Sequence, residues 1–227
     1  MTDPASVVRP ILLGHRGARA VKAIPENTIA SFDQALVDGC DGFEFDVRLS
    51  EDEEAVICHD AKVGRYDVSR TLAKDLSKLP RLRDVLQRYR DSFLDIELKV
   101  KGLERIVVDL FLRHKPRRGV VVSSFQPGTL KSLHALDGKI PLGLICEFET
   151  QLRLWNELPV QCVILEQTLA EPELIRKIKG GGKKVFVWTV NDAEEMRRFA
   201  ELQVDGIISD ETSLMCRTLR PSADEPQ

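Results

Sequence analysis

The sequence predicts an α/β protein folded as a (β/α)8 TIM barrel, in a single domain with a short insertion after the second strand. Eight short runs rich in Val and Ile alternate with segments of helical period, which is typical of parallel strands joined by helices. The 227 residues suffice for eight such units, near the small end for this fold. A doubly wound open sheet is the alternative, because periodicity does not show whether a sheet closes.

The strand candidates are short apolar runs bounded by turn residues. They cover residues 11–14, 42–47, 93–98, 119–125, 141–146, 162–166, 184–190 and 205–209. Their continuous apolar character indicates strands that are buried on both faces, as in a parallel sheet. An extra extended piece at residues 53–60 follows the second strand, and it starts the predicted insertion.

The helix candidates lie between these runs. They cover residues 27–39, 82–90, 103–111, 129–136, 150–158, 171–182 and 192–202. The clearest stripe consists of Leu103, Ile106, Val107, Leu110 and Phe111, spaced i, i+3, i+4, i+7 and i+8. We expect Asn27 or Thr28 to cap the first helix and Gly39 to end it.

The composition narrows the class of protein. The net charge of −3 gives no general attraction to nucleic acid or to an anionic membrane. The five cysteines are scattered without CxxC spacing, so we expect buried free thiols and a reducing compartment. We predict a cytoplasmic protein without signal peptide or membrane segment, because no apolar run approaches about 20 residues. The domain core is expected at about 10–218, and residues 219–227 are expected to form a disordered tail.

Polar residues gather where the predicted strands end, which is the working face of a (β/α)8 barrel. They are His15, Arg16, Glu44, Asp46, His59, Asp60, Glu97, Lys99, Ser123, Ser124, Trp188, Asn191, Ser209 and Asp210. Because the carboxyl ends of all barrel strands meet at one mouth, these side chains are expected to lie around a common site.

Three of these residues form a candidate metal site. Glu44 and Asp46 are two residues apart on a strand, so both side chains point to the same face, and Glu97 repeats this pattern on the next strand. Three inward carboxylates favour one hard divalent cation, Mg²⁺ or Ca²⁺. The alternative interpretation is a set of salt bridges between these acids and the cations Arg16 and Lys99.

Two of the four histidines, His15 and His59, fall at strand-end turns beside the carboxylates. Such a pair would serve as general acid and general base, while Arg16 and Lys99 would supply positive charge to a phosphate oxyanion. Together these groups favour cleavage of a phosphate ester. His114 and His134 lie in helical segments and are expected at the surface.

Several motifs, taken in order, resemble the glycerophosphodiester phosphodiesterase family. They are HRGA at residues 15–18, PENT at 25–28, EFDVRLSED at 44–52, VICHD at 56–60, IELK at 96–99, VWTVN at 187–191 and DGIISD at 205–210. The resemblance runs from about residue 13 to residue 210. It implies a (β/α)8 barrel that uses a divalent cation to hydrolyse glycerophosphodiesters to glycerol 3-phosphate and an alcohol.

The resemblance also assigns roles. It implies that Glu44, Asp46 and Glu97 bind the metal, that His15 and His59 are the acid and base, and that Arg16 and Lys99 contact the phosphate. By the same comparison, Glu26 and Asn27 support these residues, and Phe125 and Trp188 form apolar walls near the glycerol or the leaving group. The alternative for Asn27 is a helix cap, and for the two aromatic residues it is ordinary packing.

The chain departs from the family pattern after residue 60. The insertion is short and lacks an Arg-Thr-Thr triplet, which predicts a more open pocket. Glu147 and Glu166 match no assigned motif. Two other functions stay open: a lysophospholipase D-like or cyclising lyase activity on the same barrel, and a non-catalytic barrel that binds phosphodiesters. The preferred cation, the alcohol, the order of acid and base and the oligomeric state also stay open.

Overall fold

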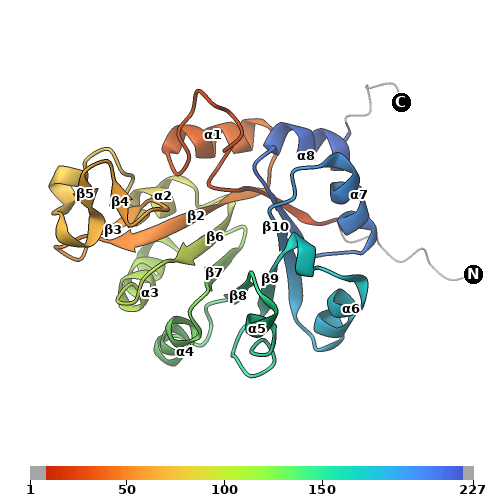
Figure 1. Cartoon of the computed structure of the whole chain (residues 1–227). Helices are drawn as coiled ribbons and strands as arrows, with labels where there is room; N and C mark the ends of the chain where they lie inside the picture. The colour runs from red at the N-terminus through yellow and green to blue at the C-terminus, as the bar shows by residue number, and fades with distance from the viewer. Residues whose placement is uncertain (1–8, 222–227) are drawn as a thin grey trace, which may run out of the picture.

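A computed structural model describes residues 9–221. Its centre is a sheet of eight parallel strands that closes on itself, because β1 pairs with both β2 and β11 (Figure 1). The barrel strands are β1 (Ile11–Gly14), β2 (Gly42–Leu49), β6 (Phe93–Leu98), β7 (Val120–Ser124), β8 (Leu142–Cys146), β9 (Cys162–Glu166), β10 (Lys184–Trp188) and β11 (Gly206–Ser209). The predicted barrel is confirmed, and the alternative of an open sheet is wrong, because an open sheet leaves its edge strands with one neighbour each.

Helices surround this barrel on the outside (Figure 1). They are α1 (Ile29–Val37), α2 (Leu82–Arg88), α3 (Glu104–His114), α4 (Pro127–Leu136), α5 (Glu149–Leu152), α6 (Pro172–Gly180), α7 (Ala193–Glu201) and α8 (Thr212–Leu219). Thr28 caps α1 by accepting a hydrogen bond from Ser31 N, and Gly39 follows the helix in a left-handed conformation with φ 102°. Of the two expected cap residues, Thr28 is the one that caps the helix.

Side chains along each strand alternate between the outer and the inner face of the barrel, so the apolar core of the barrel has two parts. Phe43 and Phe45 of β2 point outward, and the Phe43 ring stacks on Phe32 of α1 with centroids 4.2 Å apart. A second apolar cluster belongs to the inner faces of the strands. It consists of Leu13, Phe93, Val121, Ile145, Cys162, Ile164, Phe186 and Ile208. The barrel is therefore a filled core that supports the residues at its mouth.

Gly42 sits where β2 begins, between β1 and β6, and a Cβ atom at this position would overlap the backbone carbonyl of Phe93. Because a backbone carbonyl in a barrel strand cannot move alone, we expect Gly42→Ala to lower the free energy of unfolding by about 3 kcal/mol or more. Urea denaturation measures this loss. Gly128→Ala is the control, since an added Cβ meets no atom within 4 Å there. Equal stability of both variants would contradict the close approach at Gly42.

Two helical segments differ from the sequence prediction. The helix expected at residues 150–158 is the single turn α5, and successive turns follow, with Leu154 N bonded to Gln151 O and Glu157 N bonded to Leu154 O. These shorter i to i+3 bonds and Pro159 end the helix early. The helix after the eighth strand, α8, has no counterpart among the predicted segments. It is only eight residues long, with Met215 and Cys216 buried and Leu214 and Leu219 partly buried against the core.

Three residues of the expected tail, 219–221, belong to the described structure. Leu219 is the last residue of α8, and the Arg220 guanidinium pairs with the Asp41 carboxylate before β2. Residues 222–227 of the expected tail lie outside the described residues. Among the helices of residues 9–221, none combines the length and the apolar composition needed to cross a bilayer.

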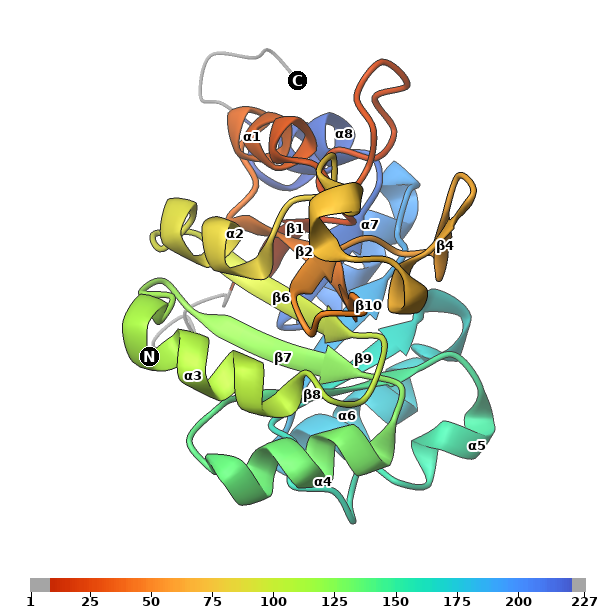
Figure 2. The ribbon, with the colours of Figure 1, turned by 90° about the vertical axis from the view of Figure 1, so that its left-hand side faces the viewer.

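The predicted insertion consists of short elements at the mouth of the barrel. They are β3 (Ala55–Ile57), β4 (Lys62–Val63), β5 (Tyr66–Asp67) and the 3₁₀ turns at Val68–Arg70 and Ala73–Leu76. β3 pairs antiparallel with β2, and β4 pairs with β5 in a hairpin. Figure 2 shows this hairpin on the side toward which the β6 and β7 arrows point. The insertion therefore lies beside the carboxyl ends of the strands.

Candidate active site

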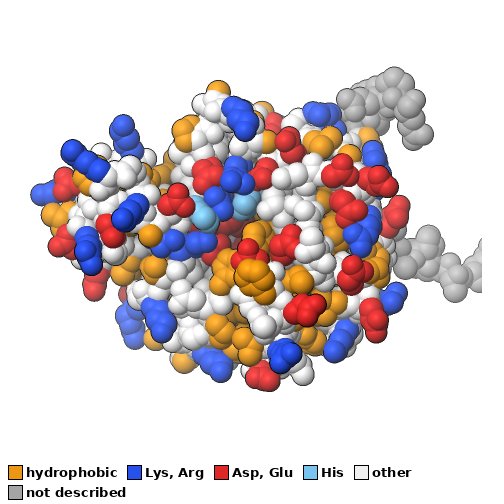
Figure 3. Space-filling view, viewed as in Figure 1, with side chains coloured by type: hydrophobic (Ala, Val, Ile, Leu, Met, Phe, Trp, Pro, Cys, Tyr) orange, Lys and Arg blue, Asp and Glu red, His pale blue; other side chains and the backbone are white. Residues whose placement is uncertain are grey.

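A cavity of about 310 Å³ opens at the carboxyl ends of the barrel strands. Its lining consists of His15, Arg16, Glu44, His59, Asp95, Glu97, Lys99, Phe125, Ile145, Glu147, Ile164, Trp188 and Ile208. In the space-filling view, His side chains lie at the centre of this face among Lys, Arg, Asp and Glu side chains (Figure 3). Charged residues from β1, β2 and β6 form one half of the cavity, and mainly apolar residues from β7 to β11 form the other.

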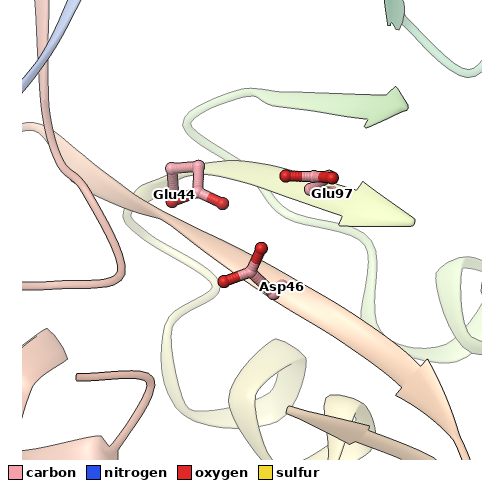
Figure 4. Close-up of side chains that lie close together, drawn as sticks. All are labelled: Glu44, Asp46 and Glu97. Carbon is pink, nitrogen blue, oxygen red and sulfur yellow. The ribbon is translucent and has the colours of Figure 1, made fainter. Parts of the chain in front are cut away.

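The three carboxylates predicted to bind a metal lie together. Glu44 and Asp46 project from β2 and Glu97 from β6, and one oxygen atom of each lies within 4.8 Å of the other two (Figure 4). All three residues are buried. The parallel register pairs Asp46 with Glu97, which explains why neighbouring strands bring these side chains to one place.

This cluster holds unbalanced negative charge. Burial, together with the neighbouring carboxylates of Asp46 and Glu97, raises the pKa of Glu44 well above its usual range. Burial also raises the pKa of Glu97, to about 7, despite the nearby Lys99 ammonium. For Asp46, burial acts in the same direction, but Lys99, Arg16 and the hydrogen bond from Asn27 outweigh it, and its pKa is lowered.

Arg16 and Lys99 are the cations of the cluster. Lys99 Nζ lies 2.8 Å from Glu97 Oε1 and 3.3 Å from Asp46 Oδ1, and Arg16 Nε lies 3.3 Å from Asp46 Oδ2. The salt bridges of the alternative interpretation therefore exist at Asp46 and Glu97. Glu44 differs, because its carboxylate accepts a hydrogen bond from the Arg16 backbone N–H (3.0 Å). Two cations do not neutralise three ionised carboxylates, so the cluster can bind a further positive charge.

The PENT segment holds these residues in place. Asn27, with φ 57°, donates from Nδ2 to Asp46 Oδ2 (2.8 Å) and accepts from Asp46 N (3.2 Å). Glu26 accepts hydrogen bonds from Arg16 Nη1 (2.8 Å) and Arg19 Nε (2.6 Å). The two residues expected to support the site thus contact a carboxylate of the cluster and the guanidinium beside it, and Asn27 does not cap α1.

The two histidines reach the same cavity from different surroundings. His15 is buried, and its Nδ1 lies 2.7 Å from Asp210 Oδ1. Burial lowers the pKa of His15 in spite of the Asp210 carboxylate. Burial raises the pKa of Asp210, but the hydrogen bond and charge of His15, with Asn191 and Arg19, together outweigh burial and lower this pKa to about 2. His59 follows β3, with 34% of its side chain exposed and its Nδ1 2.8 Å from Asp60 Oδ1.

Asp210 is one of the polar residues expected at the strand ends, but the sequence assigned it no role, and the structure places it against His15. An ionised carboxylate only accepts hydrogen bonds, so His15 Nδ1 carries the hydrogen, and Nε2, which lies 3.9 Å from Glu44 Oε2, keeps its lone pair on the side of the carboxylate cluster. Arg19 and Asn191 also donate to Asp210. The position of Asp210 directly after the last strand was the available signal, but its pairing with His15 depends on closure of the barrel.

The site residue that sequence reasoning missed is Asp95, which lies two residues before Glu97 on β6 and lines the cavity. Burial raises its pKa to about 7, and Ser123 Oγ donates to its carboxylate (2.6 Å). The period of two along β6 was the signal for this residue, because positions 95, 97 and 99 share a face.

The two aromatic residues and one of the two unassigned glutamates, Glu147, line the cavity, and the other glutamate does not. Phe125 and Trp188 both line the apolar half, with their rings in an edge-to-face arrangement and centroids 5.9 Å apart. Glu147 follows β8 and lies at the cavity, where its side chain is exposed. Glu166 does not line the cavity, and its carboxylate caps a short turn by accepting from Thr168 N (2.8 Å). His114 and His134 lie on α3 and α4, away from the cavity lining.

The carboxylate cluster fits a divalent cation. Asp46 Oδ1 is buried and lacks a hydrogen-bond partner among the residues that the structure describes, although Lys99 Nζ is 3.3 Å away. Carboxylate oxygens are the ligands that Mg²⁺ and Ca²⁺ prefer. Three such oxygens within 4.8 Å of one another, with an unsatisfied acceptor among them, match that preference.

Comparisons with known proteins agree with this geometry. A family model described as the glycerophosphoryl diester phosphodiesterase family matches residues 15–106 and 79–214. A glycerophosphodiester phosphodiesterase of Caldanaerobacter subterraneus subsp. tengcongensis is 26% identical, over 94% of this chain and 99% of the relative. One of Bacillus altitudinis is 28% identical, over 88% of this chain and 94% of the relative.

Solved structures give the same result. A glycerophosphodiester phosphodiesterase of Thermotoga maritima is 28% identical with a TM-score of 0.79, covering 92% of this chain and 97% of that one. A phosphodiesterase of Oleispira antarctica, solved with the product sn-glycerol-3-phosphate, is 26% identical with a TM-score of 0.81, covering 92% and 96%.

Proposed function

The chain belongs to the glycerophosphoryl diester phosphodiesterase family, and from this premise we propose that it hydrolyses glycerophosphodiesters to glycerol 3-phosphate and an alcohol with the help of a divalent cation. One observation supports this most directly. Three carboxylates, two imidazoles, a guanidinium and an ammonium lie in or directly against a single cavity at the barrel mouth. A site that only binds phosphodiesters has no need of two groups that transfer protons.

Glu44, Asp46 and Glu97 are the residues that would hold the cation, Mg²⁺ or Ca²⁺. When bound, such an ion supplies Lewis-acid stabilisation to a phosphoryl oxygen. Arg16 and Lys99 lie against this cluster, where they would hold the phosphate and stabilise the charge that develops on its oxygens.

His15 is suited to accept a proton from the attacking group. Its Nδ1 is committed to Asp210, so Nε2 keeps its lone pair on the side of the carboxylate cluster. His59 would then donate a proton to the leaving alkoxide, and its partly exposed position fits a group that is reprotonated from solvent. Phe125 and Trp188 would contact the carbon atoms of the substrate.

We also propose that the barrel and its insertion form a single domain in the cytoplasm. The pairing of β1 with β11 supports the single domain, because it joins the beginning and the end of the described chain in one sheet. All five cysteines are buried and unbridged, which supports a reducing compartment.

Turnover of glycerophosphocholine in the presence and absence of metal tests this function. We expect glycerol 3-phosphate to be released with Mg²⁺ or Ca²⁺, the rate to fall to background in EDTA, and excess cation to restore it. Undiminished turnover by metal-free protein would contradict the metal site.

Analysis of the products by phosphorus NMR separates the alternatives. Glycerol 3-phosphate as the end product supports hydrolysis, whereas a cyclic phosphate that persists would identify a lyase. Binding without turnover, under every metal condition, would identify a non-catalytic barrel.

A further inference from the structure

The apolar half of the cavity contains two polar groups that the proposed mechanism does not use. They are the indole N–H of Trp188, at the end of β10, and the carboxylate of Glu147, just after β8. The other residues of this half are Phe125, Ile145, Ile164 and Ile208. The indole N–H is buried, so in such apolar surroundings it is costly unless a partner satisfies it, whereas the exposed Glu147 carboxylate is accessible to water and to a ligand in the cavity.

Trp188 Nε1 is buried and, within the described part of the chain, has no hydrogen-bond partner. Trp188 is held on one side by the Phe125 ring, and His15 lies on another side with its ring centroid 6.4 Å away. An indole N–H only donates, so the group that satisfies it must be an acceptor such as a hydroxyl oxygen.

Glu147 supplies the complementary acceptor. Its backbone N–H and that of Phe148 both donate to Gln151 Oε1, at 2.7 and 2.9 Å, which fixes the loop after β8. Its carboxylate makes no ion pair with any side chain of residues 9–221. A carboxylate only accepts, so a substrate group that replaces water at Glu147 must be a donor.

We propose, on the basis of the proposed function, that Glu147 and Trp188 together recognise the hydroxyl groups of the glycerol moiety. The hydroxyls of glycerol both donate and accept, which matches one carboxylate and one indole N–H. The C–H groups between them match the surrounding Phe and Ile side chains. Glu147 is thereby a substrate-binding residue that selects glycerol over other alcohols.

A cationic alcohol such as choline fits this half of the cavity less well. The Lys99 ammonium lies 5.7 Å from the centre of the Phe125 ring, so it already occupies the neighbourhood of one aromatic face and repels a second cation. A quaternary ammonium also offers no hydrogen-bond donor to Glu147 and no acceptor to Trp188.

Steady-state kinetics of Glu147→Leu and Glu147→Gln test the proposal with two substrates that share glycerol, glycerophosphocholine and glycerophosphoglycerol. We expect Glu147→Leu to lower kcat/KM by about 10- to 100-fold on both, because a hydrogen bond to a charged acceptor is lost. Glu147→Gln keeps an acceptor and is expected to recover most of this loss. Glu149→Leu, which changes an exposed carboxylate on α5 outside the cavity lining, is the matched control.

A substrate analogue without the terminal hydroxyl of glycerol tests whether Glu147 acts through that hydroxyl. With phosphocholine esterified to 1,2-propanediol, which lacks the terminal hydroxyl, we expect wild type and Glu147→Leu to differ by less than about threefold. A second variant, Trp188→Phe, keeps an aromatic ring but removes the N–H. We expect it to lower kcat/KM on glycerophosphocholine, and circular dichroism of the same samples checks that the variant is folded.

Each result decides for or against the proposal. A loss confined to glycerophosphocholine, equal in the Leu and Gln variants, would show that Glu147 reads the positive charge of choline and would overturn it. An equal loss on the propanediol analogue, or no loss at all, would overturn it as well. If the wild type turns over none of these substrates, the proposed function itself fails, which is a distinct outcome.

Discussion

Replacing His15 with alanine is expected to lower kcat on glycerophosphocholine by about 10²–10⁴-fold, the usual contribution of a positioned general base. His15 is the imidazole whose Nδ1 is fixed by Asp210 at 2.7 Å and whose Nε2 keeps its lone pair on the side of the carboxylate cluster. The side chain sits at the mouth of the barrel and not among the inner apolar cluster, so the fold is expected to persist. Stopped assays of released glycerol 3-phosphate, with circular dichroism of the same samples, measure both.

Two further variants define the role of His15. Asp210→Asn keeps the size of the side chain but removes its charge, and we expect a smaller loss of about 10- to 100-fold, because Asp210 acts by orienting His15. His134→Ala, which changes an exposed histidine on α4, serves as the control. Near-normal turnover by the His15 variant would refute its assignment as the base.

Replacing Asp46 with asparagine is the second change for which we expect a large effect. Asp46 is 1% exposed and contacts Asn27, Arg16 and Lys99 in addition to the carboxylate cluster. Loss of its charge leaves two carboxylates for the cation and releases the two cations from their common partner. We expect metal affinity and kcat each to fall by about 100-fold or more, beyond the effect typical of residues that only surround the ligands.

The affinity is measured without any activity assay, from the rise in melting temperature that added Mg²⁺ or Ca²⁺ produces in wild type and variant. Asp109→Asn, which changes an exposed carboxylate on α3, controls for the altered net charge. The same metal-dependent rise in wild type and Asp46→Asn would exclude Asp46 as a ligand.

The fold was predictable because its signals are local. Each strand and the helix after it can be predicted from about twenty consecutive residues. The alternation of side chains along a strand is enough to place Glu44 and Asp46 on the same face. The errors concern the shortest helices: the segment after β8 forms only one helical turn, and α8 is eight residues long.

The contacts that complete the site were beyond local reasoning. His15 and Asp210 are separated by 195 residues, and their contact requires β1 to pair with β11. From its local sequence Asn27 is a candidate helix cap. Its actual hydrogen-bond partner, Asp46, lies 19 residues away on the next strand, so the local sequence does not reveal it. Such contacts between distant residues depend on closure of the barrel, and the hydrophobic periodicity of the sequence does not predict closure.

The pairing of β1 with β11 also sets an order of events during synthesis. The ribosome makes the segments that bear Glu44, Asp46 and Glu97 well before it makes Asp210, so the residues of the acidic cluster are present in the nascent chain before the orienting partner of His15. Contacts between such distant segments form late, since long loops must close first. The arrangement in which Asp210 orients His15 is therefore complete only after the last strand has inserted beside the first.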